Sequence, residues 1–219
     1  MSKTCLIIQP AGLGDILYCQ KIAKKLVIKG YEVYWPIIPH FSYISEYIKH
    51  PGIHFCNPPE EPEMTLNLQK ALYPGCSIMG SKYKLAGMNG DDWIDYFTFN
   101  RNLEKENRLH EREVKSDKYC LISKVFASPP HEETLNIEPE TDLPKVYVRT
   151  IEDFNPFDWC RIIENASEMH FVDTCFTYFI EKLETKATKL VLYPREPYHK
   201  EIITKSIWKK GWKYVNKNI

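Results

Sequence analysis

The expected fold is decided by one stretch near the start of the chain, Thr4-Cys5-Leu6-Ile7-Ile8-Gln9-Pro10-Ala11-Gly12-Leu13-Gly14-Asp15. Residues 4–9 form a short apolar run that ends at a proline and a glycine-bearing loop, which is typical of a buried parallel strand. Beyond the loop, apolar residues recur at helical spacing as far as Gly30, a suitable helix stop. Residues 31–38 are again rich in β-forming side chains. Together these patterns predict a βαβ unit.

The first half continues with weaker patterns. We expect a short helix within residues 42–50, a brief strand over 53–56 and a loop over 57–63. Over residues 64–99 the patterns weaken: the spacing is helical over 64–72 and 91–97, and the details stay open.

A charged segment separates two halves of the chain. Residues 101–117 are poor in core residues, which predicts an exposed helix or a connector, and we place the boundary between residues 1–115 and 116–219. The second half is expected to hold strands over residues 119–126, 145–149, 168–172 and 187–193, helices over 156–166 and 174–183, and a loop at Ser128-Pro129-Pro130. The sequence therefore predicts an α/β protein with two Rossmann-like halves that face each other.

The composition excludes several classes of protein. Hydrophobic residues make up 43% and charged residues 26% of the 219 residues, which argues against disordered, collagen-like and coiled-coil chains. Lys plus Arg and Asp plus Glu both number 29, so no net charge favours nucleic acid. Residues 182–219 carry ten Lys or Arg against three Asp or Glu, which would allow a weak contact with an anionic surface.

The cysteines and the apolar runs indicate in which cellular compartment we expect the protein. Seven scattered cysteines without a Cys-x-x-Cys pair argue against a disulfide framework and a thiolate zinc site, and favour a reducing environment. No apolar run approaches the roughly 18 residues of a membrane span, and no signal-peptide core is visible. We expect a cytoplasmic protein without a transmembrane segment.

The first candidate site follows the first strand, at Gly12-Leu13-Gly14-Asp15. Glycines let the backbone turn tightly and let a ligand approach closely, and Asp15 falls in the first turn of the next helix. Leu17 stands where the dinucleotide fingerprint needs its third glycine, so a nicotinamide or flavin cofactor is not expected. Two interpretations of Asp15 stay open, a catalytic carboxylate or a charge that stabilises the helix start.

The second candidate site is the strand-to-helix passage at residues 172–178. Backbone N–H groups at a helix start can bind a pyrophosphate, Thr174 and Thr177 add hydroxyl donors, and Asp173 can accept hydrogen bonds from sugar hydroxyls. The alternative is a simple helix cap by Asp173 or Thr174.

Further candidates lie at other strand ends. Lys124 and Arg149 could neutralise a diphosphate, although strand-end cations are also ordinary surface residues. Trp35, His40 and Tyr43 could stack on a sugar, although aromatic side chains are more often core. The histidines show no metal-ligand spacing, and the chain has neither a Gly-x-Ser-x-Gly elbow nor a Walker loop.

Two segments together resemble GT-B glycosyltransferases of the lipopolysaccharide heptosyltransferase type. They are Ile7-Ile8-Gln9-Pro10-Ala11-Gly12-Leu13-Gly14-Asp15-Ile16-Leu17 and Val172-Asp173-Thr174-Cys175-Phe176-Thr177-Tyr178-Phe179. In that family a glycine-rich loop with Gly-Asp opens the acceptor domain, and an Asp-Thr/Ser-Gly-x-x-His segment opens a helix of the nucleotide-sugar domain. Cys175 and Tyr178 stand where the family has glycine and histidine. Residues 157–178 are also similar to small virus and phage proteins of this superfamily, which would place a viral member in the host cytoplasm.

The resemblance implies an activity and roles for residues. It implies two Rossmann-like halves that face a central cleft, residues 1–115 on the acceptor side and 116–219 binding the nucleotide sugar. The reaction would be an inverting transfer of a sugar from a nucleotide-diphosphate donor to a hydroxyl of a glycan or another acceptor, with Asp15 as general base. No cofactor or metal is implied. The donor would contact Gly14, Lys124, Arg149, Asp173, Thr174, Cys175, Phe176 and Thr177, and the acceptor Trp35, His40 and Tyr43.

Two other functions stay open. Residues Val146-Tyr147-Val148-Arg149-Thr150 resemble the strand-arginine segment of fucosyltransferases, which would keep the fold and change the donor. Alternatively, the changes at Cys175 and Tyr178 fit a non-catalytic module that binds a nucleotide sugar or a glycan.

Overall fold

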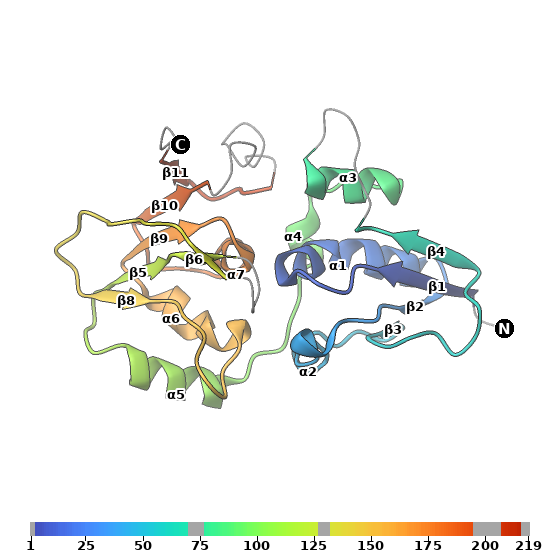
Figure 1. The fold of residues 1–219 in the computed structure, drawn as a ribbon, viewed down its shortest axis with the longest axis horizontal. Helices are drawn as coiled ribbons and strands as arrows, with labels where there is room; N and C mark the ends of the chain where they lie inside the picture. The colour runs from blue at the N-terminus through green and yellow to red at the C-terminus, as the bar shows by residue number, and fades with distance from the viewer. Residues whose placement is uncertain (1–2, 70–76, 127–131, 195–206, 216–219) are drawn as a thin grey trace. The chain divides into compact units, whose positions relative to one another are not determined.

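The computed structural model describes residues 3–69, 77–126, 132–194 and 207–215. The chain divides into two compact units, Met1–Asn100 and Arg101–Ile219, each built on its own parallel sheet (Figure 1). They are called the first and the second unit below.

The sheet of the first unit has the strand order β3-β2-β1-β4, and all its pairs are parallel. Its strands are β1 (Lys3–Ile8), β2 (Tyr31–Tyr34), β3 (Ile53–His54) and β4 (Met64–Asn67). The central strand β1 buries Cys5 and Ile7 completely, as expected for an apolar strand with neighbours on both sides.

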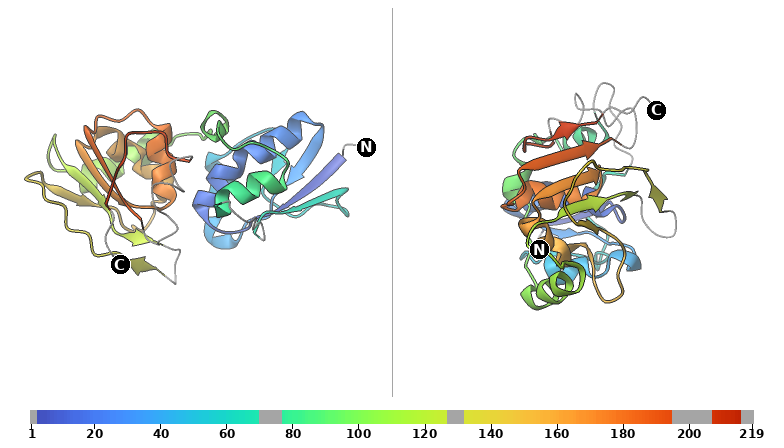
Figure 2. Two further views of the ribbon diagram at one scale, coloured as in Figure 1. Left: turned by 90° about the horizontal axis from the view of Figure 1, so that it is seen from above. Right: turned by 90° about the vertical axis from the view of Figure 1, so that its left-hand side faces the viewer.

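One long helix covers this sheet. Helix α1 (Leu13–Ile28) contacts β2 and β3 as well as α3 (Ile78–Leu85) and α4 (Trp93–Tyr96), and Figure 2 shows α1 and α3 side by side. Its buried lysines are tied to the α4 region, because Lys21 pairs with Asp92 and Lys24 donates to the carbonyl of Tyr96. Two short helical turns, η1 (Pro39–Phe41) and α2 (Ile44–Tyr47), follow β2.

The helix expected over residues 64–72 is wrong for its first part. Residues Met64–Asn67 form the edge strand β4, in which Met64 lies opposite Cys5 and Leu66 opposite Ile7. The spacing of apolar residues is compatible with a helical turn, but this segment pairs with β1 in the folded protein, and that tertiary context prevails over local propensity. Residues 70–72 lie outside the described part of the chain.

The sheet of the second unit has the order β11-β10-β9-β5-β8, again with parallel pairs only. Its strands are β5 (Cys120–Ser123), β8 (Lys145–Tyr147), β9 (Glu168–Val172), β10 (Lys189–Tyr193) and β11 (Lys213–Tyr214). Every residue of β9 is buried, which matches its position in the sheet.

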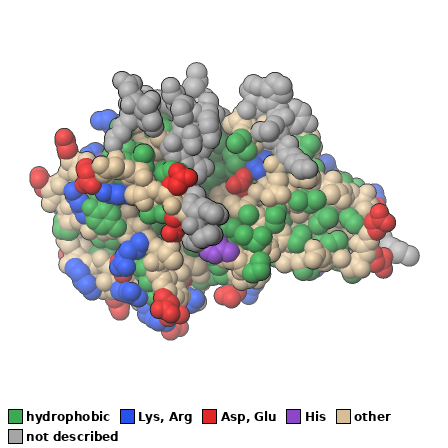
Figure 3. All heavy atoms as spheres, viewed as in Figure 1, with side chains coloured by type: hydrophobic (Ala, Val, Ile, Leu, Met, Phe, Trp, Pro, Cys, Tyr) green, Lys and Arg blue, Asp and Glu red, His purple; other side chains and the backbone are tan. Residues whose placement is uncertain are grey.

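Helical elements pack together in the second unit. They are α5 (Leu103–Glu113), η2 (Pro156–Trp159), α6 (Cys160–Asn165) and α7 (Cys175–Lys182). Helix α5 contacts η2 and α6, and Arg101 ahead of it pairs with the buried Glu106 and with Glu164. The units therefore divide before α5, whereas the sequence analysis placed the boundary after it. The outer side of helix α5 carries charges of both signs, which are visible in Figure 3.

Segments without regular secondary structure also pack against the second sheet. Cys120, Ile122, Val172, Val191 and Tyr193 cluster with Ile137, and Leu135 and Leu143 pack against this cluster. The antiparallel ribbon of β6 (Val125–Phe126) and β7 (Glu133–Thr134) contributes Phe126 to the same cluster.

Some expectations fall on residues outside the described part of the chain. They are the loop at Ser128-Pro129-Pro130 and the portions 195–206 and 216–219 of the basic C-terminal segment. Within the described residues, no helix combines the length and the apolar composition that a membrane span requires.

Candidate functional site

Asp15 lies at a point of the first sheet where ligands commonly bind. Strand order reverses beside β1, because the chain goes from β1 to β2 on one side and reaches β4 on the other. In open parallel sheets, such a switch point leaves a crevice at the carboxyl ends of the strands. Asp15 follows the carboxyl end of β1, in the first turn of α1.

A buried lysine holds the Asp15 carboxylate. Lys82 of α3 pairs with Oδ1 of Asp15 at 2.9 Å, and the two side chains are 3% and 31% exposed. The same ammonium donates to Oε1 of Gln9 at 2.6 Å and to the carbonyl of Leu68 at 3.0 Å. Three acceptors satisfy the three N–H groups of Lys82, so the lysine is fixed and Asp15 is the partner that solvent and a ligand can reach.

The backbone angle and the close packing at position 12 explain why this loop needs a glycine. The φ of Gly12, 81°, lies in the left-handed region, and a Cβ built on this residue would stand 2.5 Å from Oδ2 of Asp15. The carboxylate therefore leans back over the bare Cα of Gly12, while the Gly12 carbonyl accepts the N–H of Ile16 at 3.0 Å. Both the backbone angle and the space for Asp15 depend on the missing side chain.

Lys82 was missed by the sequence analysis. Helix α3 also carries Lys84, which is exposed, and nothing in the local pattern distinguishes the two lysines. Only the packing of α3 against α1 shows which of them is buried. A buried lysine needs partners on several elements, and those contacts are tertiary.

Trp35 is a core residue, contrary to its expected role in stacking on an acceptor. It is 1% exposed, and its indole N–H donates to the carbonyl of Gln9 at 2.9 Å. The ring packs near Phe55, so Trp35 supports the strand end on which Gln9 and Asp15 depend. His40 is exposed and Tyr43 is half-buried, with Phe41 contacting both rings.

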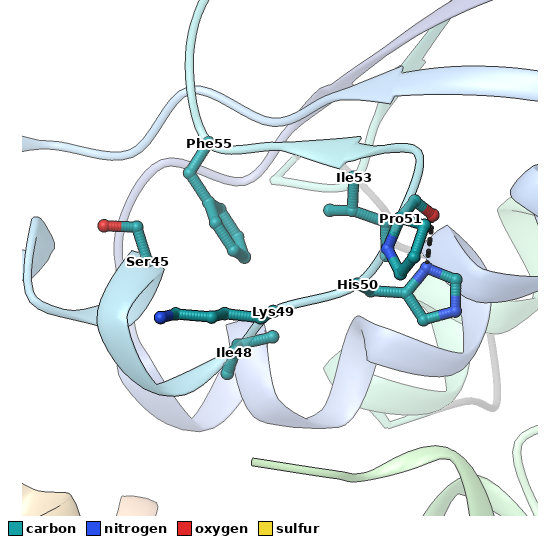
Figure 4. A pocket seen from close by; sticks show the side chains of 7 residues that line it. All are labelled: Ser45, Ile48, Lys49, His50, Pro51, Ile53 and Phe55. Atoms are coloured by element: carbon teal, nitrogen blue, oxygen red, sulfur yellow. Dashed lines mark hydrogen bonds between the residues drawn. The ribbon is translucent and has the colours of Figure 1, made fainter. Parts of the chain in front are cut away.

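A shallow hollow lies beside α2 in the first unit (Figure 4). It has a volume of about 400 Å³ and is lined by Ser45, Ile48, Lys49, His50, Pro51, Ile53 and Phe55. Figure 4 shows the apolar side chains of Ile53 and Phe55 above the lysine stem of Lys49. None of the acceptor residues expected from the sequence lines this hollow.

The second candidate segment follows a second switch point. The second sheet reverses its order between β5 and β9, and Asp173 and Thr174 come directly after β9. Thr174 caps α7, since its hydroxyl accepts the N–H of Phe176 at 3.4 Å. The Thr177 hydroxyl donates to the carbonyl of Thr174 at 2.6 Å and is fully buried. The capping interpretation is therefore correct for Thr174, and it leaves open whether the helix start also binds a ligand.

Two aromatic residues of α7 pack inward. Phe176 contacts the rings of Trp159 and Phe171. Tyr178 is 6% exposed and packs edge-to-face on Trp208 at a centroid distance of 4.6 Å. Cys175 is half-buried at the helix start. Tyr178 thus serves packing at the position where the resembled family has a histidine.

Lys124 and Arg149 each have a carboxylate partner. Lys124 follows β5, pairs with Glu138 at 2.6 Å and lies 5.3 Å from the ring centroid of Tyr147. Arg149 follows β8 and donates twice to Glu113, at 2.7 and 2.9 Å. In each pair one member is well exposed, Glu138 with 65% and Arg149 with 53% of its side chain, so either ion pair can open and free its cation for a phosphate.

Solved structures show which fold this is. The chain superposes on a glycosyltransferase family 9 protein from Veillonella parvula with a TM-score of 0.55 and 8% identity, over 97% of this chain and 86% of that one. The fold is heptosyltransferase-like. For the Escherichia coli heptosyltransferase WaaC with ADP-2-deoxy-2-fluoro heptose, the TM-score is 0.51 at 10% identity, over 97% of this chain and 92% of that one.

A third neighbour is longer. The glycosyltransferase TibC of enterotoxigenic E. coli matches with a TM-score of 0.52 and 9% identity over 88% of this chain, which spans 60% of the TibC chain. No protein-family model and no curated protein matches the sequence. At these identities the likeness establishes a Rossmann-like α/β fold with parallel sheets and leaves the activity to be argued from the residues.

Proposed function

We propose that this protein is a glycosyltransferase that moves a sugar from a nucleoside-diphosphate donor to an acceptor hydroxyl, with inversion and without a metal. The observation that carries the proposal is the Asp15 carboxylate, partly exposed at the switch point of the first sheet and held by the buried Lys82. A fixed carboxylate is what a one-step displacement requires of its general base.

In the proposed reaction Asp15 removes the proton of the acceptor hydroxyl. The acceptor oxygen attacks the anomeric carbon, and the bond from that carbon to the diphosphate oxygen breaks. The products are the glycoside and the nucleoside diphosphate. Lys82 keeps its ammonium on Oδ1 throughout, so that Oδ2 is the oxygen offered to the proton.

The donor diphosphate is assigned to the carboxyl edge of the second sheet. Backbone N–H groups at the start of α7, with Asp173 and Thr174 beside them, supply the polar contacts. Lys124 or Arg149 would neutralise the leaving group after separating from its carboxylate partner. This arrangement needs no metal for the departing phosphates.

The acceptor is assigned to the first unit. His40 and Tyr43 are the two expected residues that keep ring surface at or near solvent, and Trp35 drops out of the set. The two-half GT-B arrangement, in which both substrates meet in a cleft, is part of this proposal.

The choice of donor to test first comes from the neighbours. WaaC was solved with ADP-2-deoxy-2-fluoro heptose and TibC with ADP-D-β-D-heptose. We infer that an ADP-sugar is the first donor to try, followed by GDP- and UDP-sugars.

The first experiment is a thermal-shift screen of the full chain with ADP, GDP and UDP and their sugars. A ligand present at a hundred times its Kd stabilises by about 2.7 kcal/mol, which such a screen detects. A selective shift names the donor. The absence of a shift with every nucleotide would contradict the donor site at residues 173–177.

The second experiment tests the base. With the donor identified, Asp15→Asn should lower transfer or donor hydrolysis by a factor of about 10² to 10⁴ and leave nucleotide affinity unchanged. The matched control is Asp95→Asn, a change at an exposed aspartate of the same unit. Equal losses of affinity and turnover in Asp15→Asn would contradict the assignment.

A second candidate function is a non-catalytic module that binds a nucleotide sugar. The observation that favours it is the use of Tyr178 for packing on Trp208, which leaves α7 without the polar side chain of the resembled family. This function predicts a nucleotide-dependent thermal shift with no turnover for any acceptor.

A further inference from the structure

Three metal-ligating side chains meet inside the second unit, apart from the residues proposed for the donor. One ligand atom each of Cys120, Glu168 and His170 lies within 4.8 Å of the others, and all three residues are buried. Cys120 opens β5 and lies opposite Glu168, which opens β9, and His170 is two residues further along β9. Alternation along the strand puts all three on one face of the sheet.

His170 offers an unused nitrogen at the centre of this cluster. Its Nδ1 lies 2.8 Å from the hydroxyl of Tyr193, whereas its buried Nε2 has no hydrogen-bond partner and is 3.6 Å from Oε1 of Glu168. That distance is too long for a hydrogen bond. If Nδ1–H donates to Tyr193, the lone pair of Nε2 points toward Cys120 and Glu168. Metal-bound histidines are commonly held by such a second hydrogen bond.

The ligands themselves can balance the charge of a divalent cation, against the nearby positive charges of Lys189 and Lys145. Burial, together with the neighbouring Glu168 carboxylate, raises the pKa of the Cys120 thiol to about 12, so this thiol stays protonated until a cation binds. Glu168 is paired with Lys189, whose side chain is 43% exposed and can swing into solvent. A thiolate and a carboxylate would then neutralise a doubly charged ion.

We propose that Cys120, His170 and Glu168 bind a thiophilic divalent cation, Zn²⁺, through Sγ, Nε2 and one carboxylate oxygen. Sulfur, imidazole and carboxylate are the ligand types that zinc takes in proteins, and a water would complete four-coordination. The ion would join β5 to β9 and release the thiol proton of Cys120 to solvent.

The site is structural and independent of the proposed transfer reaction. Cys120 and Glu168 stand at the amino ends of their strands, whereas Asp173 and Lys124 follow the carboxyl ends. The absence of a Cys-x-x-Cys pair argued against a thiolate zinc site, but that pattern covers only ligands close together in the chain. These ligands come from two strands that are neighbours only in the folded sheet.

The experiment uses the untagged full chain, freed of metal with a chelator and titrated with Co²⁺ and Zn²⁺. Co²⁺ should give a thiolate-to-metal charge-transfer band and the visible bands of a tetrahedral site, and Zn²⁺ should displace it. Free Zn²⁺ at a hundred times its Kd should raise Tm by about 5–10 °C.

Variants decide which residues bind the ion. Cys120→Ser, His170→Gln and Glu168→Gln should each lower Zn²⁺ affinity by about tenfold or more. Cys160→Ser, a change at another fully buried cysteine of the same unit, should leave it unchanged. Circular dichroism of the metal-free variants separates loss of binding from loss of folding.

Three results would overturn the proposal. One is the absence of a charge-transfer band in the wild type. Another is a band that persists at full strength in folded Cys120→Ser or His170→Gln. The third is a band lost in Cys56→Ser, which would place the ion at an exposed cysteine instead.

Discussion

Lys82 joins three parts of the first unit through one ammonium group. It contacts Gln9 after β1, Leu68 after β4 and Asp15 at the start of α1. Each of these acceptors would lose a buried partner if the lysine were removed. The residue therefore serves both the stability of this sheet edge and the position of the candidate base.

Lys82→Met should lower the free energy of unfolding by about 1–3 kcal/mol, because buried acceptors are left without a donor. It should also lower turnover, since Asp15 becomes free to rotate. The measurements are chemical denaturation and, once the donor is known, kcat. Lys84→Met is the matched control on the exposed side of α3. Wild-type turnover in a folded Lys82→Met protein would contradict the positioning role.

Gly12→Ala should harm the site more than its backbone strain alone predicts. An alanine at a φ of 81° costs about 1–2 kcal/mol, and its Cβ would also displace Oδ2 of Asp15. Gly30→Ala isolates the first effect, because Gly30 has a φ of 87° and open space around its Cα. We expect similar losses in Tm for both and a loss of turnover for Gly12→Ala only. Comparable turnover in the two variants would argue against a role for the close contact between the Gly12 backbone and the Asp15 carboxylate.

At the scale of elements, the sequence predicted strands best where an apolar run coincided with a fully buried position. The expected strand over residues 168–172 matches β9 in both bounds. Edge strands were predicted less evenly. The edge strands β3 and β8 fall within the expected strands 53–56 and 145–149, whereas residues 64–67 were expected to be helical and β11 was not expected. Short edge strands depend on their neighbours more than on their own composition.

Helix α7 is connected to the last described strand through one buried carboxylate. Glu181 accepts the backbone N–H groups of Lys209 and Lys210 at 2.9 and 3.2 Å and the indole N–H of Trp212 at 2.7 Å. Trp212 immediately precedes β11, the edge strand beside β10. The carboxylate thereby anchors the segment that completes the second sheet.

Glu181→Ala should lower the free energy of unfolding by about 2–4 kcal/mol, because three donors lose a charged acceptor. Limited proteolysis should then cut around residues 207–215 earlier than in the wild type. Glu184→Ala, at an exposed glutamate just beyond the same helix, should change neither result. An unchanged Tm for Glu181→Ala would show that packing of Trp208 and Trp212 is sufficient.

At the scale of the whole molecule, the sequence predicted two βα units and parallel sheets but not their strand order. The candidate positions Asp15 and Asp173 could be predicted because both follow strands that the pattern makes plain. Lys82 could not, and neither could the cluster of Cys120, Glu168 and His170, because these contacts join segments far apart in the chain. The ion pairs of Lys124 and Arg149 could not be predicted from the sequence either.

The division into two units gives a prediction about binding. All residues assigned to the nucleotide diphosphate except Gly14 lie in residues 101–219. A chain of residues 101–219 should therefore unfold cooperatively and show a thermal shift with the same nucleotide as the full chain. Residues 1–100 should show none. A shift by the first unit alone would reverse the assignment of donor and acceptor sides.

The strands of the first sheet all lie within residues 3–67, and its helices end before residue 97. Domains generally fold as units while a chain is being synthesised, the earlier one first. Every pairing partner of β1 is thus available before α5 has been translated. On the ribosome, the Asp15–Lys82 pair can be in place while the residues that would bind the nucleotide are still being made.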